Sequence, residues 1–225
     1  MNVFITGANR GIGLGFVHHY LDNDNEVWAC YRSDRGGLDK IDNPHLHLVQ
    51  WDVMQDNPTS VDGDLPANID VLINNAGIYG PSKDANQSLN AVTPDDMHKV
   101  FDIDCLGALR VVKLLWPAVV KAKGVIANLS SKMGSSADNT SGGCYAYRAA
   151  KAALVIVSKS MAIDLASKGV RVITLHPGWV RTDMTDHSGL IDVVESVAGM
   201  TRVINSIDKY KPGEFVAFDG KVIPY

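Results

Sequence analysis

Tyr147 and Lys151 are the side chains in this sequence best placed to do chemistry together. They lie four residues apart in a segment with helical patterning, sixteen residues after Ser131. On a helix, residues at this spacing share a face with Cβ atoms ~5–6 Å apart, so the ammonium would lie beside the phenol. A free phenol has a pKa near ~10, and lowering that pKa to about 7 requires ~4 kcal/mol of preferential stabilisation of the anion. A fixed cation can supply this stabilisation, so the spacing favours a tyrosine that exchanges a proton.

Two other tyrosines compete with Tyr147 for this role. Tyr79 and Lys83 repeat the five-residue pattern, but a glycine and a proline lie between them and predict a loop, where the two side chains need not share a face. Tyr145 lies on the same segment as Tyr147 but has Ala149 four residues on, so it lacks a cation and is interpreted as a pocket or packing residue. We therefore assign the proton transfer to Tyr147.

A glycine-rich loop directly follows the first apolar run. Gly7, Gly11 and Gly13 have the spacing Gly-x-x-x-Gly-x-Gly between an expected strand at Val3–Thr6 and an expected helix at Ile12–Leu21. Glycine permits a tight turn and a close approach of the backbone to a ligand, and the free N–H groups at a helix start suit a pyrophosphate. The spacing differs from the generic Gly-x-Gly-x-x-Gly fingerprint, so a turn needed only for packing is the alternative. A bound dinucleotide is the favoured interpretation.

Short apolar, β-branched runs recur along the chain between longer amphipathic stretches. Near-continuous apolar strands separated by helical segments are typical of a parallel sheet covered on both faces. The expected strands are Val3–Thr6, Val27–Tyr31, Leu46–Trp51, Val71–Asn74, Val125–Leu129, Val170–His176 and Phe215–Phe218. We expect an α/β fold of the Rossmann type, with one doubly wound parallel sheet of about seven strands in a single domain over residues 1–225.

Helical patterning is clearest in two long segments, Met97–Val120 and Tyr147–Ser167. Thr93 can cap the first of these helices, and a proline follows it at the first helical position. The connections Ser33–Pro44 and Met54–Ile69 are short or rich in helix-breaking residues, so the covering helices there are expected to be short or absent.

The composition bounds the class of protein. The 225 residues are 46% hydrophobic and carry a formal net charge of -4, which gives no basic field for nucleic acid. No apolar stretch has membrane-spanning length and no room for a cleavable signal peptide precedes the glycine loop, so we expect a cytoplasmic protein with no membrane partner. Cys30, Cys105 and Cys144 are widely spaced and expected to be reduced. His45 and His47 lack acidic or cysteine neighbours in the sequence, so no metal site is expected.

Five short motifs occur in an order and at a spacing that together resemble the short-chain dehydrogenase/reductase family. In chain order they are Thr-Gly-x-x-x-Gly-x-Gly at Thr6–Gly13, Asn-Asn-Ala-Gly at Asn74–Gly77, Ser-Ser at Ser130-Ser131, Tyr-x-x-x-Lys at Tyr147–Lys151 and Pro-Gly at Pro177-Gly178. Within the family, the residues around the third to fifth motifs are similar to the small carbonyl reductases of the sniffer and C-signal group. The resemblance covers nearly the whole chain.

The resemblance implies an oxidoreductase that transfers hydride between a nicotinamide dinucleotide and a carbonyl or alcohol. Tyr147 would be the general acid in reduction and the general base in the reverse oxidation. Ser131 would hydrogen-bond the carbonyl oxygen, and Lys151 would hold the ribose and keep the phenol acidic. Ser130 is the less suitable serine, because adjacent residues on a strand point to opposite faces and the family uses the second serine of the pair.

The charge around the second strand favours NADP over NAD. NAD enzymes usually place a carboxylate at the end of this strand, whereas the additional phosphate of NADP needs cations. Here Arg32 follows the strand and Arg10 adds a guanidinium from the glycine loop, although Asp34 could select NAD if it turned inward. The expected cofactor contacts, several of them implied only by the resemblance, are Gly7, Arg10, Gly11, Ile12, Gly13, Arg32, Asp52, Val53, Asn75, Ala76, Gly77, Tyr147, Lys151, Pro177, Gly178, Val180 and Thr182.

One position departs from the family pattern. Asp104 stands where the family commonly has an asparagine that positions a water in a proton relay, and a carboxylate accepts hydrogen bonds but donates none unless protonated. The loop Asp138–Gly143 is expected to shape the substrate pocket, and Thr185–Gly189 is a short lid that leaves the pocket open. Tyr145 and Trp179 could line this pocket, with core packing an equal alternative for Trp179.

Two classes of function stay open. The main expectation is an NADPH-dependent reductase of small aldehydes or ketones, and the alternative is a dinucleotide-binding signalling or sensor protein with little turnover. The Ser131, Tyr147 and Lys151 set favours chemistry, because a sensor needs only the cofactor loop. A sugar-nucleotide epimerase is less favoured, since the chain is short for one. By resemblance, a homodimer or homotetramer formed through the long helices is expected.

Overall fold

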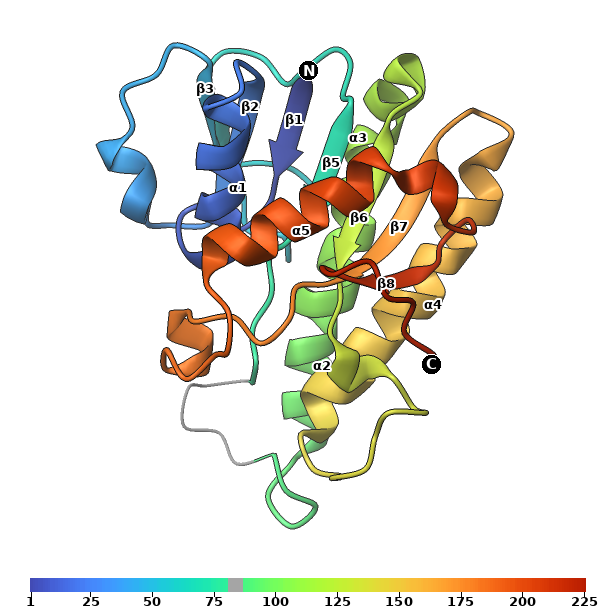
Figure 1. Cartoon of the computed structure of the whole chain (residues 1–225). Helices are drawn as coiled ribbons and strands as arrows, with labels where there is room; N and C mark the ends of the chain where they lie inside the picture. Colours follow the sequence, from blue (N-terminus) through green and yellow to red (C-terminus); the bar gives the residue numbers. More distant parts are fainter. Residues whose placement is uncertain (81–86) are drawn as a thin grey trace.

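The computed structural model describes residues 1–80 and 87–225. These residues form one eight-stranded sheet with the order β4-β3-β2-β1-β5-β6-β7-β8. Figure 1 shows the sheet between helices on its two faces. The strands are β1 (Asn2–Ile5), β2 (Glu26–Tyr31), β3 (Leu46–Gln50), β4 (Ser60–Val61), β5 (Val71–Asn74), β6 (Val125–Leu129), β7 (Arg171–His176) and β8 (Phe215–Ala217).

All seven expected strands are present, each within two residues of its expected bounds. Every neighbouring pair among them is parallel, which confirms the doubly wound α/β class. The eighth strand, β4, is two residues long and pairs antiparallel with the edge strand β3. It lies in the segment expected to lack a covering helix, and a pairing this short leaves almost no hydrophobic pattern in the sequence.

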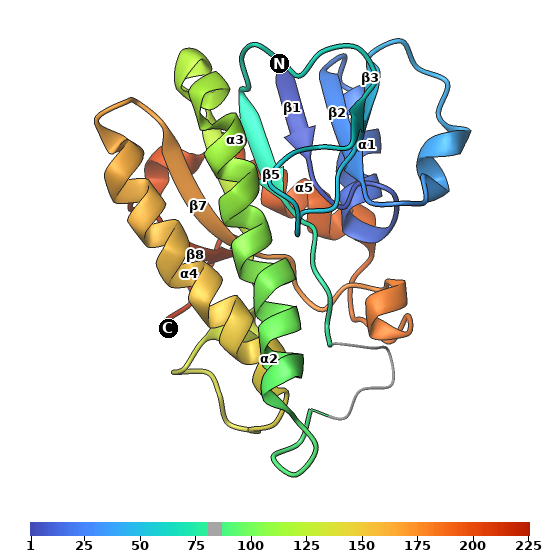
Figure 2. The ribbon, with the colours of Figure 1, turned by 180° about the vertical axis from the view of Figure 1, so that it is seen from behind.

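Helices cover both faces of the sheet. On one face lie α1 (Gly11–Leu21) and α5 (Val193–Asn205), which enclose a core with Phe16, Ile73 and Met200. On the other face lie α3 (Gly107–Ala122) and α4 (Tyr145–Ala166), as the reverse view in Figure 2 shows. Because both faces are buried, the strands are apolar almost throughout, and this is the pattern that the sequence displays.

The first long helical segment is divided into three pieces. α2 (Pro94–Phe101) begins at a capping box in which Thr93 Oγ1 accepts from the backbone N–H of Asp96 and the Asp96 carboxylate accepts from the N–H of Thr93, confirming Thr93 as the cap. The helix then passes through one π-helical turn, η2 (Asp102–Leu106), before α3 begins. Such turns insert one extra residue and change the direction of the side chains, and they occur often at functional sites.

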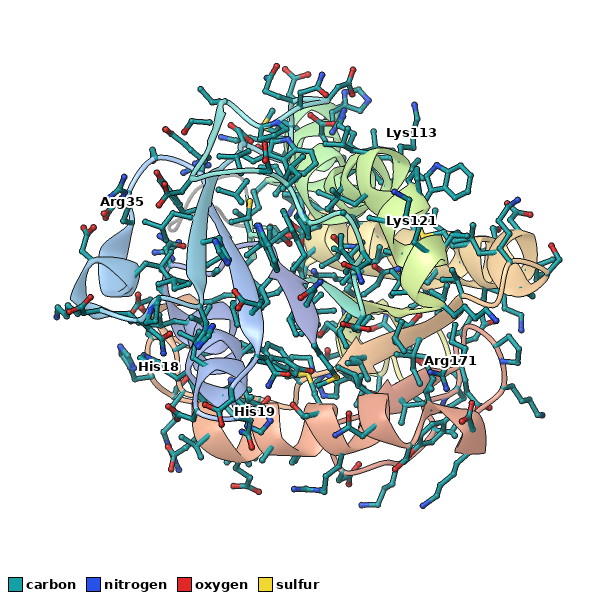
Figure 3. The ribbon with its side chains drawn as sticks, turned by 90° about the horizontal axis from the view of Figure 1, so that it is seen from above. His18, His19, Arg35, Lys113, Lys121 and Arg171 are labelled. Atoms are coloured by element: carbon teal, nitrogen blue, oxygen red, sulfur yellow. The ribbon has the colours of Figure 1, made fainter. Side chains whose placement is uncertain are left out.

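The connection after β2 contains a single 3-10 turn, η1 (Gly36–Lys40), so the expectation of a short or absent helix is confirmed. Figure 3 shows four basic side chains at the periphery of the molecule. Arg35 lies beside this turn, Lys113 and Lys121 lie on α3, and Arg171 lies on the opposite side from Arg35. No helix in the described ranges is both long and apolar enough to cross a membrane.

His45 and His47 have an acidic neighbour that the local sequence did not reveal. Parallel pairing of β2 with β3 brings Glu26 beside both histidines, and its two carboxylate oxygens each lie 2.7 Å from one imidazole nitrogen. Hydrogen bonds from His47 and His45 lower the pKa of the Glu26 carboxyl. Across residues 1–80 and 87–225, no group of three or more His, Cys, Asp or Glu side chains is arranged to hold a metal ion.

Candidate active site

The expected functional residues gather at the carboxyl ends of the central strands. In Figure 1 the arrows of β1 and β6 point downward, and the loops after β1, β5, β6 and β7 meet beneath them. The sheet order reverses between β1 and β5, because the chain runs outward through β2 and β3 before returning to the centre. In open α/β sheets, ligands bind outside the carboxyl ends of the strands at such a reversal.

The glycine loop between β1 and α1 is held tightly by the loop after β5. Thr6 Oγ1 accepts from the backbone N–H groups of Asn75 and Ala76, each at 3.0 Å. The Asn75 amide donates back to the carbonyl oxygens of Thr6 and Gly7. Gly7 has φ +62°, and a Cβ at Gly13 would overlap the Gly7 carbonyl oxygen. The close approach therefore requires glycine, and Asn75 and Ala76 support the loop in addition to their expected cofactor contact.

The start of α1 suits a negatively charged ligand. Among the described residues, no side chain caps this helix start at Arg10, and the first turn contains no acidic residue. Backbone N–H groups at a free helix start attract phosphate groups. The residues therefore fit the pyrophosphate of a dinucleotide, with Gly11, Ile12 and Gly13 supplying the backbone groups.

The groups around the end of β2 leave the NADP expectation in place. Arg32 is exposed beyond the strand. The Asp34 carboxylate accepts from the Gly36 N–H at 2.9 Å, so it completes the turn that follows the strand. Arg10 lies 3.9 Å from Asp183, on the segment after β7, in an exposed ion pair that contributes little. This contact does not test the expected cofactor role of Arg10, which stays a prediction.

The residues after β3 and β7 have local structural roles as well. Asp52 Oδ1 accepts from the Met54 N–H at 3.0 Å, which is the turn role that an aspartate alone would predict. The carbonyl oxygen of Val53 accepts from the Arg110 guanidinium. Gly178 has φ +87°, and Pro177 accepts a hydrogen bond from Ser196 through its carbonyl oxygen. None of these contacts tests the expected cofactor roles, which stay predictions.

The segment expected to act as a short lid is a compact turn. Thr182 caps η4 (Asp183–Thr185), and the Thr185 hydroxyl donates to the carbonyl oxygen of Val180 at 2.7 Å. Val180 is buried and pairs with Ile191 in an isolated bridge. The bridge ties the two ends of the turn to each other, and Thr182 lies beside Gly11 of the glycine loop.

Ser131, Tyr147 and Lys151 come together and are all buried. Ser131 follows β6, and its hydroxyl lies close enough to the Tyr147 phenol to help lower the pKa of that phenol. Tyr147 and Lys151 lie in the first two turns of α4, with Lys151 Nζ 5.6 Å from the centroid of the Tyr147 ring. Ser130 donates instead to the Lys151 carbonyl oxygen at 2.8 Å, so it anchors the helix and cannot serve as the second hydroxyl of the site.

The pKa of the Tyr147 phenol is raised from its ordinary value. Burial is the largest cause, and the carboxylate of Asp104 adds to the rise. Lys151 and the Ser131 hydroxyl both lower the pKa but do not outweigh burial. The lysine therefore has the expected effect on the phenol, although burial outweighs it in the protein without cofactor, and the expectation that Lys151 keeps the phenol acidic stays a prediction.

Asp104 lies against the lysine of the site. Its Oδ2 is 3.1 Å from Lys151 Nζ, and its Oδ1 accepts from the Ile78 N–H at 2.8 Å. Within the described part of the chain, the Oδ2 atom has no well-aligned hydrogen bond, so the contact with Lys151 is mainly an ion pair. Lys151 also donates to the carbonyl oxygen of Leu129 at 3.1 Å.

Two residues at the site were not expected to contact Tyr147. The ring of Tyr79 lies 5.1 Å from the ring of Tyr147, and Gln87 accepts from the backbone N–H of Tyr147 at 3.0 Å while donating to the Tyr79 carbonyl oxygen. Gln87 carried no sequence signal, since a single glutamine in a loop forms no pattern. Lys83, the partner of Tyr79 in the repeated pattern, lies outside the described residues.

The expected pocket residues around the site are partly open to solvent. Tyr145 is 39% exposed and Trp179 is 52% exposed, so packing in the core is excluded for Trp179. Near the start of α4, Arg148 donates to the Met133 carbonyl oxygen and to the Ser141 hydroxyl. This guanidinium attaches the expected pocket loop to the helix that carries Tyr147.

A helix start suited to a phosphate group, together with a buried serine, tyrosine and lysine at the reversal of a doubly wound sheet, is the arrangement of a dinucleotide-dependent oxidoreductase. The chain belongs to the short-chain dehydrogenase family, because the sequence model described as short chain dehydrogenase matches residues 1–190. It is 41% identical to C-signal of Myxococcus xanthus over 158 residues, which cover 70% of this chain and 93% of C-signal. The family transfers hydride, so the chain is an oxidoreductase of this type.

Solved structures agree with this assignment over the full length of the chain. The NADPH-bound carbonyl reductase from chicken fatty liver superposes with a TM-score of 0.87 at 31% identity, covering 100% of this chain and 98% of that chain. The carbonyl reductase Sniffer of D. melanogaster superposes with a TM-score of 0.87 at 27% identity, covering 100% and 99%. The expected resemblance to carbonyl reductases is confirmed.

Proposed function

We propose that this protein is an NADP-dependent reductase of small carbonyl compounds that also catalyses the reverse oxidation of the alcohols. The observation that carries the proposal is the buried contact of Ser131, Tyr147 and Lys151 beside a helix start suited to a dinucleotide. The similarity to an NADPH-bound carbonyl reductase supports both the cofactor and the substrate class.

Each residue of the site has a defined task in the proposed reaction. Bound NADPH would supply the hydride. Ser131 donates a hydrogen bond to the carbonyl oxygen, which gains negative charge as the bond to carbon forms. Tyr147 transfers its phenolic proton to that oxygen, and in alcohol oxidation the phenolate takes the proton back. Lys151 orients the cofactor ribose and stabilises the phenolate by its charge.

The chain also provides the residues that would hold the cofactor. Gly11, Ile12 and Gly13 present backbone N–H groups to the pyrophosphate, and Arg32 provides a cation for the additional phosphate of NADP. Val180 and Thr182 would contact the nicotinamide end from the segment after β7. Tyr145 and Trp179 offer partly exposed aromatic surface for an apolar substrate.

The test is oxidation of NADPH and NADH by purified protein with a panel of aliphatic and aromatic aldehydes and ketones. We expect turnover with NADPH, and loss of about 10²-fold or more in kcat for Tyr147→Phe, because the phenol is the proton donor. Tyr145→Phe is the matched control and should keep kcat within about threefold, the range expected for a side chain outside proton transfer. Retained activity in Tyr147→Phe would remove Tyr147 from its assigned role.

A signalling or sensor protein with little turnover is the second candidate. It is favoured by the 41% identity to C-signal and by Asp104 at a position where the family commonly has asparagine. Fluorescence titration with NADPH separates the two. Tight binding together with no turnover across the panel would support the sensor and contradict the reductase.

We also propose a homo-oligomer formed through the long helices. Ile156 and Ile163 lie seven residues apart on α4 and are both more than half exposed, so they form an apolar stripe. Sedimentation velocity should show a dimer or tetramer for the native chain and a smaller species for Ile163→Glu. A native monomer at micromolar concentration would contradict this proposal.

A further inference from the structure

Asp104 is held in a rigid, fully buried position. It lies in the π-helical turn η2 between α2 and α3, and that turn is the point at which the long helix changes its side-chain direction. A Cβ added to Gly77 would lie 3.2 Å from both Asp104 Oδ2 and Lys151 Nζ. A side chain at Gly77 would therefore crowd both charged groups, and the hydrogen bond from the Ile78 N–H fixes the other carboxylate oxygen.

The two charges of the pair are shielded from water. The Asp104 side chain is 0% exposed and the Lys151 side chain is 6% exposed, with 3.1 Å between their charged atoms. Charges in such an environment are screened much less than charges at the surface. Because the two charges are opposite and 3.1 Å apart, the Asp104 carboxylate offsets part of the field of the ammonium at the Tyr147 hydroxyl.

Among residues 1–80 and 87–225, the other titratable groups in contact with the site carry no negative charge that could replace that of Asp104. Burial raises the pKa of the Cys105 thiol to about 11, and burial with a hydrogen bond to Cys144 raises the pKa of the Tyr79 phenol to about 12. Both are neutral at pH 7. The hydroxyl of Tyr79 and the Cys144 thiol contact each other at 2.9 Å, and Arg148 is directed toward Met133 and Ser141. Asp104 is thus the charged group in contact with Lys151.

We infer that Asp104 is a positioning residue that neutralises the charge of Lys151 and so holds Tyr147 in its protonated form, which biases the site toward carbonyl reduction. The inference rests on the proposed function. In reduction, the carbonyl carbon receives a hydride from the bound nicotinamide cofactor, the carbonyl oxygen receives the proton from Tyr147, and an alcohol and a phenolate result. Alcohol oxidation needs the phenolate at the start, so a protonated Tyr147 favours the reductive direction.

The directions of the pKa shifts in the site agree with this geometry. Burial alone disfavours the ammonium of Lys151, but the pKa of Lys151 is nevertheless raised because the Asp104 carboxylate stabilises the charged form. Burial raises the pKa of Asp104, and Lys151 opposes that rise. For Tyr147, burial is the largest cause of the raised pKa, the Lys151 ammonium opposes the rise, and the Asp104 carboxylate adds to it.

The direct test is titration of Tyr147 in the protein without cofactor, by NMR of tyrosine labelled at the ring carbon that bears oxygen. The Tyr147 signal is assigned by its absence in Tyr147→Phe. In Asp104→Asn the ammonium acts on Tyr147 without compensation, and the pKa of Tyr147 should fall by about one to two units, as expected for a charge several ångströms away in a partly buried site. Asp102→Asn is the matched control, since Asp102 lies in the same turn but pairs with Arg110 at 2.6 Å.

Activity gives the second readout. In Asp104→Asn the alkaline limit of carbonyl reduction should move to lower pH by the same one to two units, and the ratio of alcohol oxidation to carbonyl reduction at pH 7 should rise about 10- to 100-fold. A variant that only perturbs the structure would lower both rates together. An unchanged Tyr147 titration in folded Asp104→Asn would overturn the inference.

A double variant covers the case in which Asp104→Asn fails to fold. Asp104→Asn combined with Lys151→Met removes both buried charges, a replacement that proteins often tolerate. Tyr147 should then titrate within about half a unit of the native value, because the pair is neutral in both proteins. Lys151→Met alone should raise the pKa of Tyr147, and a larger shift in the double variant than in this single variant would contradict the inference. Loss of turnover in the native chain would defeat only the proposed function, since the NMR titration needs neither cofactor nor substrate.

Discussion

The rings of Tyr79 and Tyr147 lie 5.1 Å apart with an angle of 48° between their planes. The tyrosine of the loop pattern therefore contacts the tyrosine of the helix pattern, although the sequence presents them as rivals. The Lys151 ammonium lies beside Tyr147 and opposes the effect of burial on the pKa of that phenol. For Tyr79, burial with the hydrogen bond to Cys144 raises the pKa of the phenol to about 12. Its ring instead forms one wall beside the proposed proton donor.

Substitution of Tyr79 should separate the effect of its ring from that of its hydroxyl. Tyr79→Phe keeps the ring and should leave kcat/KM within about threefold of the native value, because it loses only a partly exposed hydrogen bond. Tyr79→Ala removes the aromatic contact, worth about 0.5–1.5 kcal/mol, and should lower kcat/KM about tenfold. Steady-state kinetics with one aldehyde check both values. A greater loss in Tyr79→Phe than in Tyr79→Ala would mean that the hydroxyl takes part in the reaction.

The fold could be predicted from the sequence because the strongest patterns are local. Seven apolar runs gave the seven parallel strands, and Thr93 gave the start of α2 through its capping box. The π-helical turn η2 was not predictable, because its residues continue the helical pattern on both sides. Long patterns identify the type of an element well but carry no signal for one inserted residue.

The site could be predicted only where its residues lie in one pattern. Tyr147 and Lys151 are four residues apart on α4, so their contact follows from helix geometry. The contact between Asp104 and Lys151 joins two different helical segments, and only the departure from the family asparagine was visible in the sequence. The neighbours Tyr79 and Gln87 reach the site from loops, whose paths local patterns do not define.

The exposed guanidinium of Arg32 should determine the preference for NADPH. Arg32→Ala should weaken NADPH binding about 10- to 100-fold, because a charge-assisted hydrogen bond to phosphate contributes about 1.5–3 kcal/mol. Binding of NADH, which lacks this phosphate, should change less than about threefold. Fluorescence titration with each cofactor measures both dissociation constants.

Arg35→Ala is the matched control for this prediction. Arg35 lies three residues after Arg32, but its guanidinium is 5.8 Å from the centroid of the Tyr31 ring and it donates to the Tyr31 hydroxyl. Selective loss of NADPH binding in Arg35→Ala, with normal binding in Arg32→Ala, would show that Arg35 and not Arg32 contacts the phosphate.

Gly13 should tolerate no side chain. A Cβ there would overlap the carbonyl oxygen of Gly7 and lie 2.6 Å from the Asn75 amide nitrogen, and neither group can retreat without opening the loop. Gly13→Ala should therefore lose about 1–3 kcal/mol of unfolding free energy, as overpacking usually costs, together with NADPH binding. Gly63→Ala is the control, since Gly63 has φ +78° but no atom within 4 Å of its Cβ position. Urea unfolding should show destabilisation in both, with loss of cofactor binding confined to Gly13→Ala.

His176 should make the protein sensitive to mild acid. Its Nδ1 accepts from the backbone N–H of Lys132 at 3.3 Å, an arrangement that requires the neutral ring. Burial, reinforced by the nearby Lys132 ammonium, lowers the pKa of His176 to about 4. In the unfolded chain, His176 is protonated near pH 6.5, about 2.5 pH units above its pKa in the folded protein. Between pH 6.5 and pH 4 the unfolded state therefore binds more protons than the folded state. Folding stability should thus fall as the pH drops through this window, by at most about 3 kcal/mol.

Replacement of His176 isolates this effect from the other titrating groups. The glutamine in His176→Gln cannot titrate. When the pH is lowered from 7 to 4.5, the unfolding free energy of this variant should therefore fall by about 2 kcal/mol less than that of the native chain. Most of the proton uptake by the unfolded histidine occurs in that interval. Urea unfolding at both pH values measures the difference. Equal losses in the two proteins would show that the folded state accepts a proton on His176 as readily as the unfolded chain. That outcome would require the hydrogen bond from Lys132 to break without cost, against the burial of the ring.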